Sequence, residues 1–440
     1  MQKADLIKQT YFSFVQKQEQ KKKCYHNNKA NKLFEQDRAF HQWYRFVLSF
    51  PPHLVQEYME RFSSKKEDIL LDPFCGTGTT LVEAKIHNIP CVGVESNKMA
   101  FFASNVKCDW EIDADQFIAD SKRIAEISEK KIRFNKKLRI LPKDQMELLL
   151  KYSISPIPLH KTLILLETIN ESKTRLTNHQ RLAFATATVQ YASNLHFGPE
   201  VGVSKIKKQD SDVIDDWFST IQMFARDLKG LRNKKKFQVS DIILGDSRNL
   251  ADSLENYYGR ISIVFTSPPY PNEKDYTRTT RLESVLLGFL QNKNELREMK
   301  QTLLRSNSRN IYKHDNDDNF IIHHSEVIKL AETIEAKRIA MGKTSGFEKM
   351  YHKVVRQYFG GMARHLESLK PFLKKGAMLG YVVGDQASFL QVYIPTGKIL
   401  ADIAVCLGYK LVSINLFRKR FATATKMNMN EEVVVLQWNG

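Results

Sequence analysis

The chain has 440 residues, and its 67 Lys plus Arg against 49 Asp plus Glu give a net charge of +18 and a sequence pI near 9.4. This positive excess is typical of proteins that bind nucleic acid. No apolar stretch approaches the roughly 18 residues of a membrane span, and the Lys- and Gln-rich beginning lacks the apolar core of a signal peptide, so we expect a cytoplasmic protein without a membrane segment. The five cysteines are scattered without a Cys-x-x-Cys pair, which predicts reduced thiols and no bound metal.

The most informative segment follows a buried parallel strand predicted over residues 68–71. Gly76 and Gly78 allow a sharp turn there and a close approach of a ligand to the backbone, before a helix that begins at Thr79. The segment lacks the Gly-Lys-Ser/Thr ending of a phosphate loop and the third glycine of a dinucleotide fingerprint, so an adenosyl ligand without a pyrophosphate fits better. It reads Asp72-Pro73-Phe74-Cys75-Gly76-Thr77-Gly78-Thr79-Thr80.

Two further predicted strands, 91–94 and 241–244, each lead to a carboxylate. Glu95 stands about twenty residues after the glycines, where nucleotide-binding sheets place an acceptor for ribose hydroxyls. Asp246 can accept from an adenine amino group, although a helix cap explains Asp246 and Ser247 nearly as well. Because parallel strands present their carboxyl ends at one edge of a sheet, these side chains are expected to line a common pocket.

The second motif, Ser267-Pro268-Pro269-Tyr270, follows a strand predicted over residues 261–265. The prolines have no N–H, so the carbonyls before them act as fixed acceptors. The oxygen of Ser267 and one such carbonyl can accept the two hydrogens of an exocyclic NH2 group and draw its lone pair toward an electrophile. Tyr270 offers a ring on which a base can stack. Alone, the segment would fit a surface Pro-Pro turn, but the glycine segment upstream favours the functional interpretation.

The remaining elements of the sheet are predicted near the C-terminus. Apolar spacing predicts a strand within 375–385, a helix over 397–407, and two strands, 410–417 and 432–438, that form a terminal hairpin. Shortly after the Ser-Pro-Pro-Tyr segment, the stretches Asp275-Tyr276 and Arg281-Leu282-Glu283 either shape the pocket for the base or serve as helix caps and surface pairs.

About 130 residues separate the second and third strands, far more than a crossover needs. We therefore predict a mainly helical insertion over 111–238, a second insertion over 291–350, a basic polar segment over 1–39, and a catalytic domain formed by 40–110 and 239–440. Clustered Lys and Arg in both insertions suit contacts to phosphates. The predicted DNA contacts are Lys136, Lys137, Arg139, Lys207, Lys208, Arg305, Arg309, Arg418 and Arg420.

These motifs resemble those of the DNA amino-methyltransferases, which transfer a methyl group from S-adenosylmethionine to the N4 of cytosine or the N6 of adenine. The glycine segment resembles the cofactor motif of that family, the segment from His41 to Phe46 with Phe50 resembles its N-terminal cofactor element, and the Ser-Pro-Pro-Tyr segment resembles its catalytic motif. The cofactor contacts implied are Phe50, Asp72, Pro73, Phe74, Cys75, Gly76, Thr77, Gly78, Thr79, Thr80, Glu95, Ser96, Asn97, Asp246 and Ser247. The catalytic residues implied are Ser267, Pro268, Pro269 and Tyr270.

The resemblance implies an α/β, Rossmann-like class I methyltransferase fold, with a mostly parallel seven-stranded sheet, a C-terminal antiparallel hairpin and a helical insertion. A serine at the first catalytic position is more typical of the N4-cytosine group, so the implied activity is site-specific methylation of cytosine N4 in double-stranded DNA by base flipping. S-adenosyl-L-methionine is the implied cofactor, and a restriction endonuclease of the same restriction-modification system is an associated partner. N6-adenine methylation, guanine N2 methylation of tRNA, and a non-catalytic DNA-binding subunit stay open as alternatives.

Overall fold

A computed structural model of the chain describes residues 32–44, 49–135, 137–198, 200–231, 237–272, 274–422 and 426–440. Its centre is a seven-stranded sheet in the order β5-β2-β1-β6-β7-β9-β8. The first five of these strands are mutually parallel, and β9 is antiparallel to both of its neighbours. The predicted fold class, a mostly parallel sheet that ends in an antiparallel hairpin, is thereby confirmed. The strands of the sheet are β1 (Ile69–Asp72), β2 (Cys91–Glu95), β5 (Ser240–Leu244), β6 (Ile261–Thr266), β7 (Leu373–Gly384), β8 (Lys410–Ala422) and β9 (Met427–Gln437).

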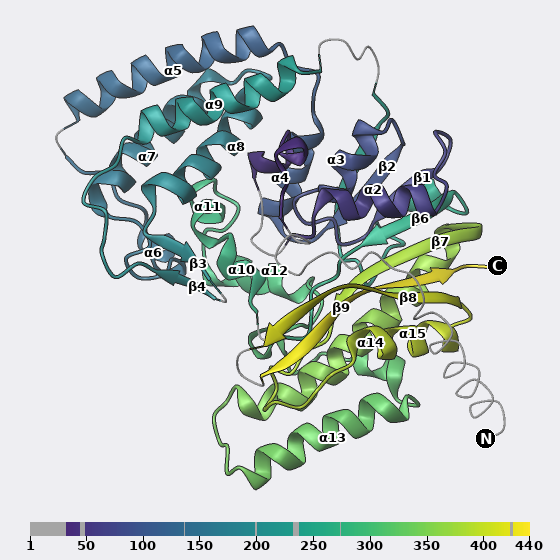
Figure 1. Ribbon diagram of the computed structural model, residues 1–440. Coiled ribbons are helices and arrows are strands. Elements are labelled where there is room, and N and C mark those ends of the chain that lie inside the picture. The colour runs from purple at the N-terminus through teal and green to yellow at the C-terminus, as the bar shows by residue number, and fades with distance from the viewer. Residues whose placement is uncertain are drawn as a thin grey trace.

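Helices cover both faces of the sheet (Figure 1). Successive strand residues point to opposite faces, so Leu70 packs into one apolar cluster and Leu71 into another. The face of Leu70 is covered by α2 (Pro52–Arg61), α3 (Thr79–Ile86) and α4 (Lys98–Cys108). The face of Leu71 is covered by α13 (Ser325–Ala340), α14 (Tyr351–Leu369) and α15 (Thr396–Cys406). Two buried faces explain why Ile69, Leu70 and Leu71 of β1 are consecutive apolar residues instead of alternating with polar ones.

The helical insertion forms a separate layer beside this core (Figure 1). Its helices are α5 (Ala114–Phe134), α6 (Lys143–Leu148), α7 (Pro156–Ser172), α8 (Thr177–Ala187) and α9 (Val213–Lys229). Helix α6 ends at Leu148, because Leu149 adopts an extended conformation. The insertion also holds an antiparallel pair, β3 (Leu195–Phe197) and β4 (Val201–Val203), which the sequence analysis did not predict.

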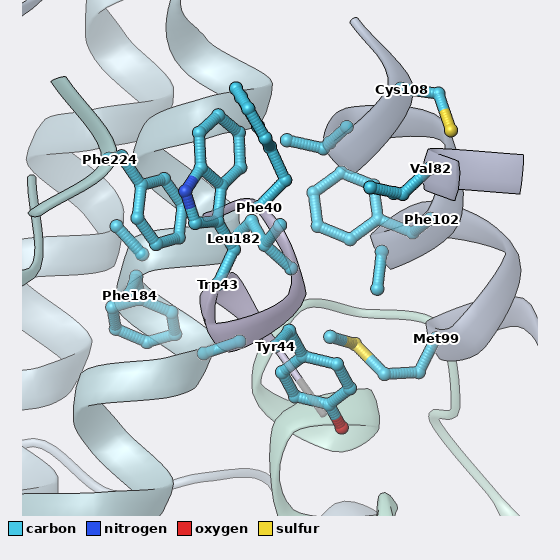
Figure 2. Packing of buried hydrophobic residues seen from close by; sticks show 14 of the residues in the cluster. Phe40, Trp43, Tyr44, Val82, Met99, Phe102, Cys108, Leu182, Phe184 and Phe224 are labelled. Carbon is cyan, nitrogen blue, oxygen red and sulfur yellow. The ribbon is translucent and has the colours of Figure 1, made fainter. Parts of the chain in front are cut away.

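The segment from Phe40 to Tyr44 lies between this insertion and the helices of the core (Figure 2). The indole of Trp43 is fully buried and stacks on Phe224 of α9, with ring centroids 4.2 Å apart and planes 7° apart. Its Nε1 donates to Asp227 at 2.8 Å, and the backbone N–H of Phe40 donates to the same carboxylate oxygen at 3.1 Å. Tyr44 reaches the other way and donates to buried Glu283. This short segment, called the N-terminal wedge below, therefore connects the helical insertion, the helices of the core and Glu283.

The second insertion contributes α12 (Lys293–Gln301), a polar loop and α13. Between the catalytic motif and α12 lie two short helices, α10 (Tyr276–Thr279) and α11 (Arg281–Leu286). Asp275 caps α10 by accepting from the N–H of Thr277 at 3.0 Å, and Glu283 is buried against Tyr44. Of the two open interpretations for these stretches, the capping one thus applies to Asp275. Within the described residues, no helix combines the length and apolarity that a membrane span requires.

Candidate active site

The cofactor and catalytic motifs meet at one cavity of about 250 Å³ at the carboxyl edge of the sheet. The glycine turn follows β1 and the Ser-Pro-Pro-Tyr segment follows its neighbour β6, so the two motifs are adjacent although 195 positions separate Asp72 from Ser267. Its lining residues are Ser49, Phe50, Phe74, Cys75, Gly76, Thr77, Thr79, Glu95, Asn97, Ser267, Pro268, Pro269, Tyr270, Asn272, Lys274, Tyr276, Leu303, Leu304, Ser306, Asn310, Arg418, Arg420 and Glu431. All four predicted catalytic residues therefore share this wall with eight of the predicted cofactor contacts.

The glycine turn positions a carboxylate at the cavity. Gly76 has a φ of +52°, a conformation that glycine adopts at little cost, and its N–H donates to Oε2 of Glu95 at 2.8 Å. The N–H of Asn97 donates to Oε1 of the same carboxylate at 2.7 Å. Burial raises the pKa of Glu95 to about 7, against these hydrogen bonds, which favour the ionised form. Each carboxylate oxygen retains a further lone pair, so Glu95 can still accept from a hydroxyl in the cavity.

The back of the turn is held by a lysine that the sequence analysis did not single out. Lys107 of α4 is 1% exposed, and its Nζ donates to the carbonyl of Thr77 at 2.7 Å and to that of Tyr44 at 3.4 Å. Close packing holds the turn as well, since a Cβ added to Gly78 would lie 3.0 Å from the side chain of Ser104. The turn is thus fixed from behind by α4 and connected to the N-terminal wedge.

Asp72 joins the two motifs without lining the cavity. Its Oδ1 accepts from the hydroxyl of Thr266 at 2.6 Å and from the N–H of Phe74 at 3.1 Å. Thr266 directly precedes the catalytic serine, so this fully buried carboxylate fixes the end of β6 against the glycine turn. Burial raises the pKa of Asp72 to about 6, and the bond from Thr266 opposes that rise.

The Ser-Pro-Pro-Tyr segment lines the cavity and is held by hydrogen bonds to the neighbouring strands. Ser267 donates its hydroxyl hydrogen to the carbonyl of Val382 on β7, with an oxygen–oxygen distance of 3.1 Å. The hydroxyl of Tyr270 donates to Oε1 of Glu431 on β9 at 3.0 Å, and Arg418 on β8 pairs with the other oxygen of that carboxylate. Burial holds the pKa of Tyr270 well above its usual range, so the phenol stays protonated and its ring is anchored through that bond.

The other predicted cofactor contacts do not line the cavity. The hydroxyl of Ser96 donates to the carbonyl of Gly245 at 2.6 Å, and the hydroxyl of Ser247 donates to the carbonyl of Pro73. Asp246 is held by Arg248, whose Nε and Nη2 donate to its two oxygens at 3.0 and 2.6 Å. The predicted cofactor contacts outside the lining set are Asp72, Pro73, Gly78, Thr80, Ser96, Asp246 and Ser247.

The residues predicted to contact DNA occupy three kinds of position. Arg418 and Arg420 line the cavity, and Lys137 and Arg309 are exposed. Arg305 is 4% exposed, and its Nε and Nη2 donate to both oxygens of Asp315 at 2.9 and 2.7 Å. Arg305 therefore holds the loop of the second insertion together, which corrects the expectation that it faces a ligand.

The other predicted contacts in the helical insertion differ in how their side chains are bonded. Arg139 pairs with Glu167 of α7, whereas Lys207 and Lys208 donate to backbone carbonyls of the insertion. Lys136 lies outside the described residues, as do Arg45 and Phe46 of the segment that resembles the N-terminal cofactor element. Within the described ranges, no three His, Cys, Asp or Glu side chains gather as metal ligands.

Nine lining residues were absent from the predicted site. Tyr276 follows the catalytic motif closely, so its stretch was considered as part of the target pocket, and it does line the cavity. Asn272 and Lys274 also follow that motif closely, and Ser49 precedes Phe50, but their residue types marked no function. The rest come from the second insertion and from β9, distant in sequence from both motifs. The nine are Ser49, Asn272, Lys274, Tyr276, Leu303, Leu304, Ser306, Asn310 and Glu431.

The chain is similar in sequence to DNA methyltransferases. A family model described as DNA methylase matches residues 2–105. The chain is 25% identical, over an alignment of 452 positions, to the type II methyltransferase M.BsoBI of Geobacillus stearothermophilus, with 94% of this chain and 86% of that protein covered. It is 28% identical over 160 residues to the type II methyltransferase M.AvaI of Nostoc sp. and of Anabaena variabilis, which covers 34% of this chain and 31% of those proteins. A modification subunit of a putative type I restriction enzyme from Vibrio vulnificus superposes with a TM-score of 0.29 at 10% identity, over 89% of this chain and 44% of that one.

Proposed function

We propose that this chain, which a DNA methylase family model matches over residues 2–105 and which is 25% identical to a type II methyltransferase over most of its length, is an N6 or N4 DNA methylase. We propose further that it transfers a methyl group from S-adenosylmethionine to the exocyclic N4 of cytosine in double-stranded DNA. The observation that carries the proposal is the bond from Ser267 to the carbonyl of Val382. Because the hydroxyl hydrogen of Ser267 is directed to that carbonyl, the oxygen lone pairs are available as acceptors for an amine in the cavity.

The cofactor side of the cavity suits an adenosyl ligand. Glu95 is held toward the cavity by two backbone N–H groups and can accept from ribose hydroxyls, while the rings of Phe50 and Phe74 form apolar walls. The turn at Gly76 brings backbone close to the ligand without a side chain in the way. When bound, S-adenosylmethionine supplies an electrophilic methyl group on a sulfonium.

The residues of the catalytic motif have separate tasks in this proposal. Ser267 accepts a hydrogen from the target amine, which favours attack by the nitrogen lone pair. Tyr270 provides the stacking surface, and Glu431 fixes its ring through the phenol. A base inside a duplex cannot reach a cavity at the edge of the sheet, so the target nucleotide must rotate out of the helix at a cost of a few kcal/mol.

The choice of cytosine over adenine rests on the serine at the first catalytic position. N6-adenine methylation by the same site is the alternative, and methylation of guanine N2 in tRNA or a scaffold without activity are the remaining ones. The type II names of the similar proteins support a role as the modification enzyme of a restriction-modification system. A cognate nuclease and a cytoplasmic location belong to this proposal. We propose Lys207 and Lys208 of the helical insertion as outer contacts to the duplex.

The test is to incubate the purified protein with unmethylated plasmid DNA and S-adenosylmethionine, digest the DNA to nucleosides, and identify the methylated species by mass spectrometry. N4-methylcytosine is the expected product. N6-methyladenine would keep the cofactor and the fold but overturn the choice of base. Methylation of tRNA alone would move the activity to RNA, and no methylation of either nucleic acid would leave a scaffold.

A further inference from the structure

The charges that line the cavity are divided between its two sides. Glu95 lies on the cofactor side, at the end of β2. On the opposite side, after β6 and on β8 and β9, three cations, Lys274, Arg418 and Arg420, accompany a single carboxylate, Glu431. Arg418 pairs with that carboxylate, so two cations remain without a carboxylate of their own.

Lys274 and Arg420 form the unbalanced pair. The guanidinium of Arg420 donates to the carbonyl of Asp385 at 3.2 Å and to the side-chain oxygen of Gln386 at 3.4 Å, both of which are uncharged acceptors. The ammonium of Lys274 has no hydrogen-bond or ion-pair partner among the residues that the structure describes. Burial, and then the positive charge of Arg420, lower the pKa of Lys274, while Glu200 and Glu431 oppose that shift.

Two neighbouring cations in a partly enclosed cavity repel each other, so the arrangement is stabilised by an anion placed between them. A cytosine or adenine base is neutral and cannot provide that charge. The carboxylate of S-adenosylmethionine is anionic, but the glycine turn and Glu95, which suit this cofactor, stand at the ends of β1 and β2 on the other side of the cavity. A nucleotide that rotates into the target side carries its flanking phosphodiesters with it.

We propose that Lys274 and Arg420 bind a backbone phosphate that flanks the flipped target nucleotide. This site rests on the proposed function, because it requires a nucleotide that has left the duplex. Its role is to hold the flipped state: the two cations bind a phosphate that reaches them only after rotation, so their contribution reduces the cost of unstacking the base.

The test combines a protein variant with a modified DNA. The methylated position is first mapped by sequencing plasmid DNA treated with the wild-type protein, and duplex oligonucleotides are built around it. Two of them carry one neutral methylphosphonate linkage, placed either 5′ or 3′ of the target nucleotide. Their affinity for wild type, Lys274→Met and Lys122→Met is measured with a fluorescent label; Lys122 is an exposed lysine of α5, so it controls for the lost charge alone.

With the unmodified duplex, Lys274→Met should bind about tenfold more weakly than wild type and lower the slope of log affinity against log salt by about one. One of the two methylphosphonates should weaken DNA binding by the wild type by a similar factor and leave DNA binding by Lys274→Met unchanged. Lys274→Arg, which retains the charge, should recover most of the affinity. The cofactor affinity and unfolding midpoint of Lys274→Met should match those of wild type.

Different failures have different meanings. If wild type methylates the duplex and Lys274→Met behaves like Lys122→Met, the phosphate site is wrong and the proposed function stands. If Lys274→Met weakens S-adenosylmethionine binding instead, the anion is the cofactor's carboxylate and the proposal is overturned. If wild type methylates no DNA, the proposed function and this site fail together.

Discussion

The hydroxyl of Ser267 lies 3.1 Å from the carbonyl oxygen of Val382, so the backbone of the adjacent strand orients the first residue of the Ser-Pro-Pro-Tyr segment. Strands β6 and β7 are paired up to Thr266 and Tyr381, one residue before each partner in this bond. The orientation of the serine oxygen is therefore a property of the sheet itself, and substitutions elsewhere in the cavity should leave it in place.

Replacing Ser267 with alanine should lower the turnover number by about 10²-fold or more, because the acceptor for the target amine is lost from an enclosed site. The affinity for S-adenosylmethionine, measured by calorimetric titration, should stay unchanged, since the serine lies on the target side of the cavity. Ser345→Ala, at an exposed position, is the control and should retain full turnover. Equal activity of the two variants would remove Ser267 from the mechanism.

The affinity for S-adenosylmethionine should strengthen as the pH rises through about 7. Burial raises the pKa of Glu95 to about 7, so the carboxyl is mostly neutral at pH 6 and mostly ionised at pH 8, and only the ionised form is a full acceptor for hydroxyls. At pH 6 about one tenth of the sites carry the ionised form, which sets the expected loss at up to about tenfold.

Glu95→Gln keeps the shape of the side chain and should remove that pH dependence while binding the cofactor more weakly at pH 8. Asp72, whose pKa is raised to about 6, is unchanged in this variant. Any effect of its titration on cofactor affinity would therefore still be observed. The same linkage has an opposite sign for folding: stabilisation by the neutral Glu95 is complete below pH 4.5 and is lost as the pH rises through 7. A cofactor affinity that does not change between pH 6 and pH 8 would contradict the role of Glu95.

The N-terminal wedge should contribute strongly to stability. Trp43→Ala removes a fully buried ring and should lower the free energy of unfolding by about 3–5 kcal/mol. Trp43→Phe keeps a ring against Phe224 but leaves Asp227 without the indole N–H, so it should cost only about 1–2 kcal/mol. Denaturant unfolding followed by circular dichroism measures both variants. Equal losses for the two would show that the hydrogen bond, and not the stacked ring, dominates the contact.

Arg248 should be more important for stability than for catalysis. It is 6% exposed and pairs with Asp246 at 2.6 Å and with Asp317 at 2.7 Å, so Arg248→Met leaves two carboxylates partly unpaired in the interior. We expect a loss of about 3–5 kcal/mol in the free energy of unfolding. Arg123→Met, which removes an exposed arginine 3.8 Å from Asp120, should change it by less than about 0.5 kcal/mol. A loss as small as that of the control would mean that water replaces the buried pairs.

Much of the fold could be predicted because its central strands are buried on both faces. Such strands are continuous apolar runs, and β1 and β6 each lead directly into a motif with its own chemistry. The hairpin of β3 and β4 could not be anticipated in the same way. Each strand has three residues, too few for an alternating pattern to emerge.

The candidate site was predicted best where its residues are consecutive in the chain. Local motifs identify the glycine turn, whereas Glu431 and Lys107 reach the site only through long-range pairing and packing. The position of Asp246 after β5 was predicted, but its ion pair was not. The guanidinium that binds it belongs to Arg248, which is part of no recognisable motif. Charge pairing in three dimensions decides which carboxylates face a ligand.

The N-terminal wedge has a consequence for exchanging parts between related enzymes. Its rings are inserted between the helical insertion and the core, and Thr186 of α8 donates to the carbonyl of Trp43, 143 positions earlier in the chain. The packing of the insertion is therefore completed by residues that precede it in the sequence. A chimera that receives the insertion helices of a relative would retain an N-terminal wedge that packs against the original helices. A chimera should therefore fold stably only when residues 40–44 are exchanged together with the helices. These two stretches, although distant in sequence, form one structural unit.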